Sequence, residues 1–436
     1  MEMQQPRKRF SVACYGAPND GVTPATEQIQ AAIDDAARCG GKVIVPAGTY
    51  HVGSLFLKSG IEFHLEEGAR LLGSTDEAQY PVIPSRVAGV ELEWPAGVVN
   101  IIGQRDVALT GSGTIDGQGP FWWNKFWGED RKGGMMKEYI DRGLRWAVDY
   151  DCTRPRNVLV MNCENILLSS FNSVRSGFWN VHLCYCNQVH VTGLTMWDNN
   201  GPSTDGVDID SCRDVLVERC TISCNDDSVC IKAGRDADGL RVNRVCENVL
   251  VRDCKFLAGE GLTLGSETSG GIRNIRLENI TFDGTACGFR MKSARTRGGV
   301  IENIQVSHLR MTNVSRPITF QLDWFPAYSY CAVPDDYQGE IPKLWTILSQ
   351  PVNPEKGIPL VRNVLVKDVV ATLSEDSEKH LAWKQSCAFD INAYSQRPME
   401  DVTFEDVEIT ADTFGEIAGV QGLKWKNVTV TIAGKK

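Results

Sequence analysis

Residues 201–232 read GPSTDGVDIDSCRDVLVERCTISCNDDSVCIK, a run in which short apolar–polar alternations are broken by polar clusters. Between residues 201 and 299, four polar strings interrupt the alternation: Ser203-Thr204-Asp205-Gly206, Asn225-Asp226-Asp227, Gly259-Glu260-Gly261 and Arg290-Met291-Lys292. Their spacings are 226 − 205 = 21, 260 − 226 = 34 and 290 − 260 = 30 residues, each about one coil of a parallel β-helix. Residues one coil apart lie about 4.8 Å apart on neighbouring strands, so the four strings are predicted to form one ladder.

The same rhythm continues along the chain. A polar residue precedes a short apolar strand at Asn165-Ile166, Gln188-Val189, Asp214-Val215, Asn248-Val249, Asn274-Ile275, Asn303-Ile304, Asn363-Val364, Asp401-Val402 and Asn427-Val428. Polar turns between β-branched strands are typical of a solenoid. A lone Asp in such a turn is ordinarily structural, but four strings at coil spacing favour a site. We therefore expect an all-β parallel β-helix.

A solenoid grows by stacking, so the 436 residues are predicted to form a single domain, residues 1–436. Residues 1–50 are predicted to cap its first coil. Within them, Thr26 to Arg38 is predicted to be an amphipathic helix with Thr26 as N-cap and one apolar face: Ile29, Ala32, Ile33 and Ala36. Residues 81–97 interrupt the rhythm, and larger insertions are predicted near residues 117–156 and 323–359.

The first insertion is rich in aromatic and cationic residues: Phe121, Trp122, Trp123, Trp127, Trp146, Arg131, Arg142, Arg145, Arg154 and Arg156. These side chains could wall a sugar groove, with rings against pyranose faces and arginines against carboxylates. Alternatively, the tryptophans could seal a small core of the insertion itself. For any single residue we favour the second interpretation. The second insertion is a candidate for the opposite wall or a long loop.

Charge and composition limit the partners. The net charge is −10, which argues against nucleic acid or an anionic membrane as the main partner. No apolar run reaches the length of a membrane span, and the first ten residues contain no signal-peptide h-region. We therefore expect a soluble, cytoplasmic protein. The sequence leaves the oligomeric state open.

Fifteen cysteines recur near the turns, as at Cys186-Asn187, Cys212-Arg213-Asp214 and Cys246-Glu247-Asn248. Their recurrence predicts stacked, buried thiols inside the coils rather than disulfides, because free Cys packs as a small hydrophobe. Many unpaired thiols favour a reducing compartment.

The ladder carries the groups that hydrolysis of a glycosidic bond requires. A direct displacement needs an acid for the leaving oxygen and a base for water. Asp226 and Asp227 are adjacent, so one pKa is expected to rise and keep that carboxyl protonated. Asp205 adds a third carboxylate one coil before. Arg290 and Lys292 alternate with apolar residues, point outward together, and are expected to hold a substrate carboxylate.

At these residues the sequence resembles glycoside hydrolase family 28, the polygalacturonase-like family. The resemblance covers nearly the whole chain and is strongest from residue 201 to 299. Thr204-Asp205-Gly206 through Cys212 matches the family's Asn-Thr-Asp motif, with Ser203 where Asn is usual. Asp226-Asp227 matches its paired aspartates, and Arg290-Met291-Lys292 its Arg-Ile-Lys motif.

The resemblance implies a right-handed, single-stranded parallel β-helix that hydrolyses α-linked galacturonate with inversion, without metal, cofactor or covalent intermediate. It implies that Asp226 is the general acid and that Asp205 and Asp227 orient the attacking water. Asp208 supports the site, and Arg290 and Lys292 bind a uronate carboxylate.

One position departs from the family pattern. Gly259-Glu260-Gly261 stands where Gly-His-Gly is usual. Glu260 could pair with Arg290 or face the substrate and accept hydrogen bonds from sugar hydroxyls. We favour the second interpretation, with the flanking glycines leaving room for a close approach, and expect Glu260 to influence which sugar occupies the leaving side.

The sequence thus predicts an exo-polygalacturonase or α-galacturonidase that acts on an acidic, pectin-derived oligosaccharide. A rhamnogalacturonan hydrolase of the same family is the first alternative. A β-helix pectate lyase would need a calcium site and a basic proton acceptor. A non-catalytic carbohydrate-binding β-helix would need no ladder of carboxylates.

Overall fold

The turn residues set the coil geometry. In the computed structural model, which describes residues 7–434, all nine polar residues predicted to precede strands have φ between 51 and 58°. This left-handed region suits Asn and Asp better than other non-glycine residues. The side-chain amides of Asn274, Asn303 and Asn363 each donate to the Asn oxygen one coil earlier, at 3.2, 3.1 and 2.7 Å. Identical turns therefore stack directly on one another.

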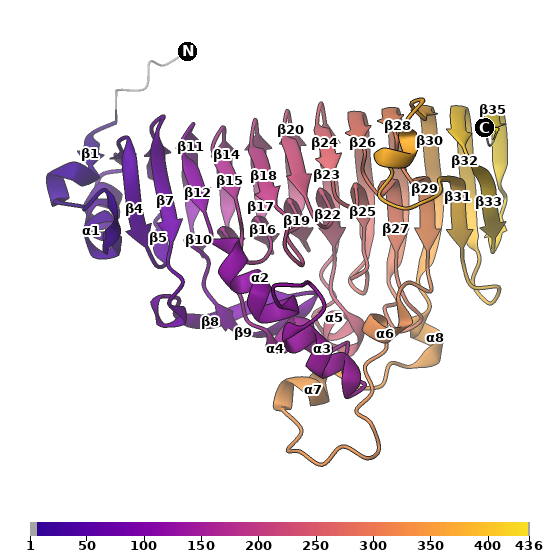
Figure 1. The fold of residues 1–436 in the computed structure, drawn as a ribbon, viewed down its shortest axis with the longest axis horizontal. Coiled ribbons are helices and arrows are strands. Elements are labelled where there is room, and N and C mark those ends of the chain that lie inside the picture. Colours follow the sequence, from indigo (N-terminus) through magenta and orange to yellow (C-terminus); the bar gives the residue numbers. More distant parts are fainter. Residues whose placement is uncertain (1–6, 435–436) are drawn as a thin grey trace.

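The stacked coils form a right-handed parallel β-helix, as expected (Figure 1). One sheet has 11 strands in consecutive coil order. They are β5 (Leu55–Leu57), β10 (Val99–Ile102), β13 (Val158–Met161), β16 (Val181–Cys184), β19 (Val207–Asp210), β22 (Val229–Lys232), β25 (Leu262–Leu264), β27 (Cys287–Lys292), β29 (Arg316–Gln321), β31 (Cys387–Asn392) and β33 (Thr413–Ala418).

The remaining faces of the coils form a second sheet of 22 strands. They are β1 (Arg9–Ser11), β2 (Asp20–Pro24), β3 (Lys42–Val45), β4 (Gly48–Val52), β6 (Glu62–Leu65), β7 (Ala69–Gly73), β11 (Arg105–Gly111), β12 (Thr114–Asp116), β14 (Glu164–Ser169), β15 (Asn172–Val174), β17 (Asn187–Thr192), β18 (Thr195–Asn199), β20 (Arg213–Glu218), β21 (Thr221–Cys224), β23 (Cys246–Arg252), β24 (Lys255–Ala258), β26 (Ile272–Asp283), β28 (Val300–Thr312), β30 (Leu360–Thr372), β32 (Met399–Ala411), β34 (Val420–Gln421) and β35 (Lys424–Ile432).

Apolar side chains fill the interior in rows that follow the coils. One row is Ile209, Ile231, Leu264 and Met291, paired in register on successive strands. A single hydrophobic cluster of such rows runs from Val12 to Ala411. Because alternate residues of each strand enter this core, the intervening residues of the 11-stranded sheet must point outward. That register is what places the charged ladder on the outside.

The N-terminal end is covered by α1 (Thr26–Ala37), seen at the indigo end of the solenoid (Figure 1). The four residues predicted to form its apolar face are its four buried residues. The predicted N-cap is wrong by one position, because Ala25 precedes the helix without a side-chain cap. The Thr26 hydroxyl instead accepts from Gly53 N at 2.9 Å and ties the helix to the first coils.

The interruptions project from the same side of the solenoid (Figure 1). Residues 81–97 contain an antiparallel hairpin, β8 (Val82–Val87) and β9 (Val90–Pro95). The first insertion contains α2 (Gly119–Trp127), α3 (Gly134–Asp141) and α4 (Val148–Asp151), and α5 (Asp236–Val242) follows β22. The second insertion contains α6 (Pro326–Ser329), α7 (Lys343–Leu348) and α8 (Pro354–Gly357). Short 3₁₀ turns occur at Val12–Tyr15, Glu77–Gln79 and Ser377–Lys379.

The two insertions are joined by aromatic contacts. Trp146 and Trp345 meet edge to face at 5.5 Å between ring centroids. The Trp146 indole N–H donates to Ala332 O at 3.0 Å, and the Trp345 indole N–H donates to Asp151 Oδ2 at 2.8 Å. Trp146 and Trp345 thus belong to a small cluster shared by both insertions, the hairpin and the solenoid, whereas Trp122 and Trp123 belong to the main core of the solenoid. These tryptophans are packed, as favoured from the sequence, but they do not form a core of the first insertion alone. Trp122 and Trp123 are also buried, and neither lines the pocket described below.

All fifteen cysteines are free, and eleven of them are buried. The Cys186 backbone N–H donates to Cys212 Sγ at 3.2 Å, one coil further on. The prediction of stacked thiols in place of disulfides is confirmed. No helix within residues 7–434 has the length and apolar character of a membrane span.

Candidate active site

The four polar strings lie on consecutive coils. Asp205 precedes β19, Asp226 and Asp227 precede β22, Glu260 precedes β25, and Arg290 and Lys292 belong to β27. These four strands are neighbours in the 11-stranded sheet. The ladder predicted from residue spacing is therefore present.

Glycines and backbone hydrogen bonds allow these turns to pack closely against one another. A Cβ at Gly259, whose φ is +96°, would lie 2.3 Å from Asp226 O, and one at Gly206 would lie 2.3 Å from Ser228 O. The Glu260 backbone N–H donates to Asp226 O at 2.8 Å. We expected the glycines around Glu260 to admit a ligand. That expectation is wrong, because the neighbouring coil occupies the space.

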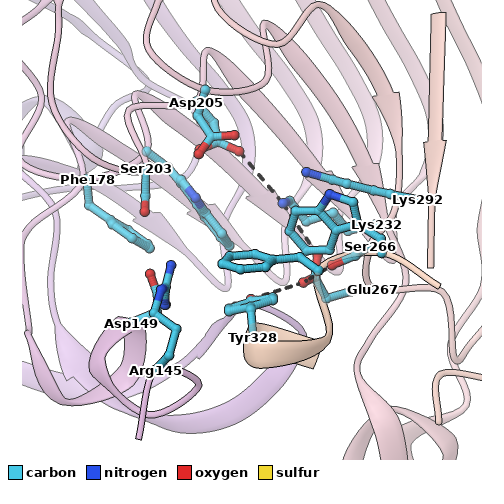
Figure 2. A pocket seen from close by; sticks show the side chains of 15 residues that line it. Arg145, Asp149, Phe178, Ser203, Asp205, Lys232, Ser266, Glu267, Lys292 and Tyr328 are labelled. Atoms are coloured by element: carbon cyan, nitrogen blue, oxygen red, sulfur yellow. Dashed lines mark hydrogen bonds and ion pairs between the residues drawn. The ribbon is translucent and has the colours of Figure 1, made fainter. Parts of the chain in front are cut away.

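A pocket lies over this ladder, between the solenoid and the insertions (Figure 2). The solenoid contributes Phe178, Trp179, Ser203, Asp205, Asp226, Lys232, Ser266, Glu267 and Lys292, and the hairpin contributes Ala88. Arg145 and Asp149 come from the first insertion, and Trp324, Phe325 and Tyr328 from the second. In the view of Figure 2, Asp205 lies opposite Arg145 and Asp149, with Lys232 and Lys292 to one side. Charged groups thus face the cavity from several elements.

Asp226 is half-buried and faces this pocket. Its Oδ1 accepts from the Asp227 backbone N–H at 2.9 Å. Burial and the neighbouring Asp227 charge raise the pKa of Asp226 to about 6. A carboxyl with that pKa holds a proton in mildly acidic solution and can donate it to a leaving oxygen.

Asp227 is completely buried and is the anionic member of the pair. Its Oδ2 accepts from Lys292 Nζ at 2.7 Å, and its Oδ1 accepts from Thr263 Oγ1 at 2.5 Å. Burial opposes ionisation, but Lys292 and Arg290 hold the pKa of Asp227 below its usual value. The two pKa values are therefore pushed apart, as the sequence predicts, so that below about pH 6 Asp226 carries a proton while Asp227 stays ionised.

Asp205 lies beside this pair and is 3% exposed. Oxygens of Asp205 and Asp227 approach within 4.8 Å of each other. Asp205 Oδ1 is buried and has no hydrogen-bond partner among the described residues. Burial and the charges of Asp208 and Asp226 raise the pKa of Asp205. An unsatisfied carboxylate oxygen at the pocket wall can accept a hydrogen bond from water.

Of the predicted substrate-binding residues, one lines the pocket and the others do not. Lys292 lines the pocket, 4.6 Å from the Trp324 ring centre, although its ammonium already bonds Asp227. Arg290 forms an ion pair with Glu260 and does not line the pocket. Asp208 is fully buried, 3.2 Å from Lys232 Nζ. The ladder is intact, but only part of it borders the cavity.

The position of the Glu260 side chain contradicts the interpretation favoured from the sequence. Its carboxylate pairs with Arg290 Nη1, and its Oε2 lies 3.7 Å from Cys287 Sγ. It does not line the pocket, so the observed arrangement is the alternative of pairing with Arg290. In this position it stabilises a buried guanidinium that also faces Asp227, with 3.8 Å between Arg290 Nη2 and Asp227 Oδ1.

Several pocket residues were missed from the sequence. Lys232 alternates with the inward Val229 and Ile231, so its outward direction was predictable. Glu267 follows β25 in a turn whose sequence has no repeating pattern from which its direction could be predicted. Trp324 and Tyr328 lie in the second insertion, where only tertiary contacts determine which side chains reach the cavity. Arg145 was named as a possible groove wall, and it lines the pocket although the packed interpretation was favoured.

Comparisons with known proteins agree with this geometry. The family model for "Glycosyl hydrolases family 28" matches residues 40–336. A "probable polygalacturonase" of Vitis vinifera is 32% identical over 314 residues, which are 69% of this chain and 60% of that protein. An "exo-poly-alpha-D-galacturonosidase" of Dickeya chrysanthemi is 27% identical over 343 residues, 71% of this chain and 56% of that protein. This chain thus spans about three fifths of the length of these relatives.

Among solved structures, a hyperthermoactive exopolygalacturonase from Thermotoga maritima is similar over 98% of this chain and 93% of its own. The TM-score is 0.75 and the sequence identity is 26%. The matched family region contains every residue of the ladder and all fifteen residues of the pocket. The chain belongs to family 28 of the glycosyl hydrolases.

Proposed function

We propose that the protein hydrolyses α-linked galacturonate from an end of an acidic oligosaccharide, with inversion at the anomeric carbon. The observation that carries this proposal is the cluster of Asp205, Asp226 and Asp227 on neighbouring coils beside the pocket, in which the pKa of Asp226 is raised to about 6 and Asp205 Oδ1 has no hydrogen-bond partner among the described residues. Inverting hydrolysis needs one carboxyl that donates a proton and one that accepts a proton. The names of the related proteins support galacturonate as the sugar.

In the proposed mechanism, Asp226 gives its proton to the glycosidic oxygen as the C–O bond breaks. A water molecule attacks the anomeric carbon from the opposite face and loses a proton to a carboxylate. Asp205 is the better placed acceptor, because its Oδ1 is free while both Asp227 oxygens are bonded. Asp227 contributes negative charge and orientation.

Exo action is proposed from the walls of the cavity. Arg145 lies 5.3 Å from the Phe325 ring centre and 5.7 Å from that of Tyr328, so both insertions meet at the pocket. A cavity bounded by such a junction favours a chain end over an internal segment. Arg145 is paired with Asp149 and Lys292 with Asp227. Each would therefore have to rearrange before it could bind a uronate carboxylate.

The test is product analysis on digalacturonate, longer galacturonans and rhamnogalacturonan oligomers, assayed side by side. Monomer released from the first minutes supports exo hydrolysis, and proton NMR should show the β-anomer first. An early ladder of mid-length oligomers would contradict exo action. Preferred cleavage of rhamnogalacturonan would favour that alternative substrate, and an ultraviolet-absorbing unsaturated product would indicate a lyase. The cytoplasmic location remains a prediction.

A further inference from the structure

Lys232 is a buried cation shared by three carboxylates. Its Nζ lies 3.2 Å from Asp208 Oδ1, 3.4 Å from Glu267 Oε2 and 3.7 Å from Asp205 Oδ2. The residue is 5% exposed, and its Nζ lies 4.8 Å from the centre of the Trp179 ring. Little water can screen the ammonium, so its charge acts strongly on all three carboxylates.

Glu267 competes with Asp205 for this ammonium. It is 2% exposed and accepts from Ser266 Oγ at 3.0 Å and from Tyr328 Oη at 3.4 Å. Both contacts reach Oε1, which leaves Oε2 directed at Lys232 (Figure 2). Because Tyr328 belongs to α6, the second insertion helps to hold the carboxylate that faces the lysine.

The charge on Asp205 depends on more groups than Lys232. The titratable and charged groups that face it are Asp208 on β19, Asp226 and Asp227 before β22, Lys232 on β22, Cys224 on β21 and Arg154 after α4. Three of these are carboxylates that disfavour its ionisation. Lys232 is the cation that forms an ion pair with it.

We propose that Lys232 and Glu267 are positioning residues that set the ionisation of Asp205 in opposite directions. Lys232 opposes the burial and the neighbouring carboxylates that disfavour ionisation of Asp205, and so favours the carboxylate form that can accept a proton from water. Glu267 neutralises part of the positive charge of Lys232 and keeps the ammonium from a closer ion pair with Asp205. This inference rests on the proposed function, because Asp205 accepts a proton only if the reaction is hydrolysis.

The experiment compares the pH dependence of kcat/KM on digalacturonate for the unaltered protein, Lys232→Met, Lys232→Arg and Glu267→Gln. Lys232→Met should move the acidic limb to higher pH by about one unit or more, since a nearby cation lowers a carboxyl pKa by 1–3 units. Glu267→Gln should move the same limb to lower pH. Lys232→Arg keeps the charge and should restore most of the unaltered profile.

A merely structural role would lower kcat in all three variants without moving the limb in opposite directions, and that result would overturn the proposal. Lys232→Met leaves three carboxylates unopposed, so Glu267→Gln and Lys232→Arg provide the test if it does not fold. Titration of ¹³C-carboxyl-labelled aspartates by NMR, with Asp205→Asn for assignment, gives a second readout. If the unaltered protein does not hydrolyse digalacturonate, the proposed function fails, while opposite NMR shifts of Asp205 would still support the positioning roles.

Discussion

Lys292 and Asp227 bond to each other across the intervening coil of Glu260, with 2.7 Å between Nζ and Oδ2. Both side chains are buried. The bond therefore joins an expected substrate-binding residue to a member of the carboxyl pair. The stability of the fold is consequently linked to the protonation of Asp227.

Lys292→Met should destabilise the fold more at pH 7 than at pH 4. Removing one partner of a buried pair costs about 3–5 kcal/mol, because the other charge is left uncompensated. The pKa of Asp227 is depressed in the folded protein, so its stabilising contribution is present above the unfolded pKa and lost as pH falls. In the variant that pKa rises, and protonation at low pH relieves the penalty. Urea unfolding at both pH values measures this, and an equal loss at each would contradict it.

Asp226→Asn should abolish turnover with little effect on folding. A positioned general acid contributes about 10²–10⁴ in rate. The residue is half-buried in the pocket, and within residues 7–434 its carboxyl accepts a single hydrogen bond, from the Asp227 backbone N–H, which the oxygen of an amide side chain can also accept. Circular dichroism and thermal unfolding provide the folding control. Near-normal kcat on the natural substrate would refute the assignment of Asp226 as the acid.

The pH profile of the unaltered protein should fall on its alkaline side from about pH 6. The pKa of Asp226 is raised to about 6, and the general acid must carry its proton to act. Above that pH the carboxyl ionises and kcat/KM decreases tenfold per unit. Initial rates on digalacturonate between pH 3 and pH 8 check this. A flat profile up to pH 8 would mean that another group donates the proton.

Glu260→His should lower activity on galacturonan and on the natural substrate to the same extent. The variant replaces the anion that pairs with Arg290 by a group that cannot compensate a guanidinium. The loss in stability should be about 1 kcal/mol, since the Glu260 side chain is 27% exposed and the pair is partly screened. Parallel assays and thermal unfolding test both parts. A relative gain on galacturonan would instead indicate contact with the substrate.

Trp345→Ala should loosen the junction of the two insertions and leave the solenoid folded. Truncating a buried Trp costs about 3–5 kcal/mol locally, and Trp345 packs against Trp146 and Tyr139 of the first insertion. We expect a larger share of mid-length oligomers among the early products on long galacturonan. Phe414→Ala, in the last coils, is the matched control and should leave the product pattern unchanged.

The repeating parts of this molecule were predictable because a coil imposes the same demands each time. Polar residues such as Asn248 and Asn274 were identified as turns, and they adopt the left-handed conformation that the stacking requires. The ladder followed from coil spacing. The direction of the Glu260 side chain did not, since the coil spacing is compatible both with a pair with Arg290 and with a side chain that faces the substrate. Arg145 was considered as a groove wall but the packed interpretation was favoured, and Tyr328 was not identified, because contacts between the insertions, which have no period, bring both to the pocket.

The reactivity of the fifteen free thiols can report on the unfolding of the protein. Only Cys14 and Cys39 are exposed, and both belong to the N-terminal cap, away from the pocket. Eleven others are buried at intervals from Cys152 to Cys287, so the central coils carry their own chemical labels. Brief treatment with an alkylating reagent in increasing urea, followed by mass spectrometry of the peptides, would reveal the order in which the coils open. The opening of the central coils can thus be followed without introducing a probe.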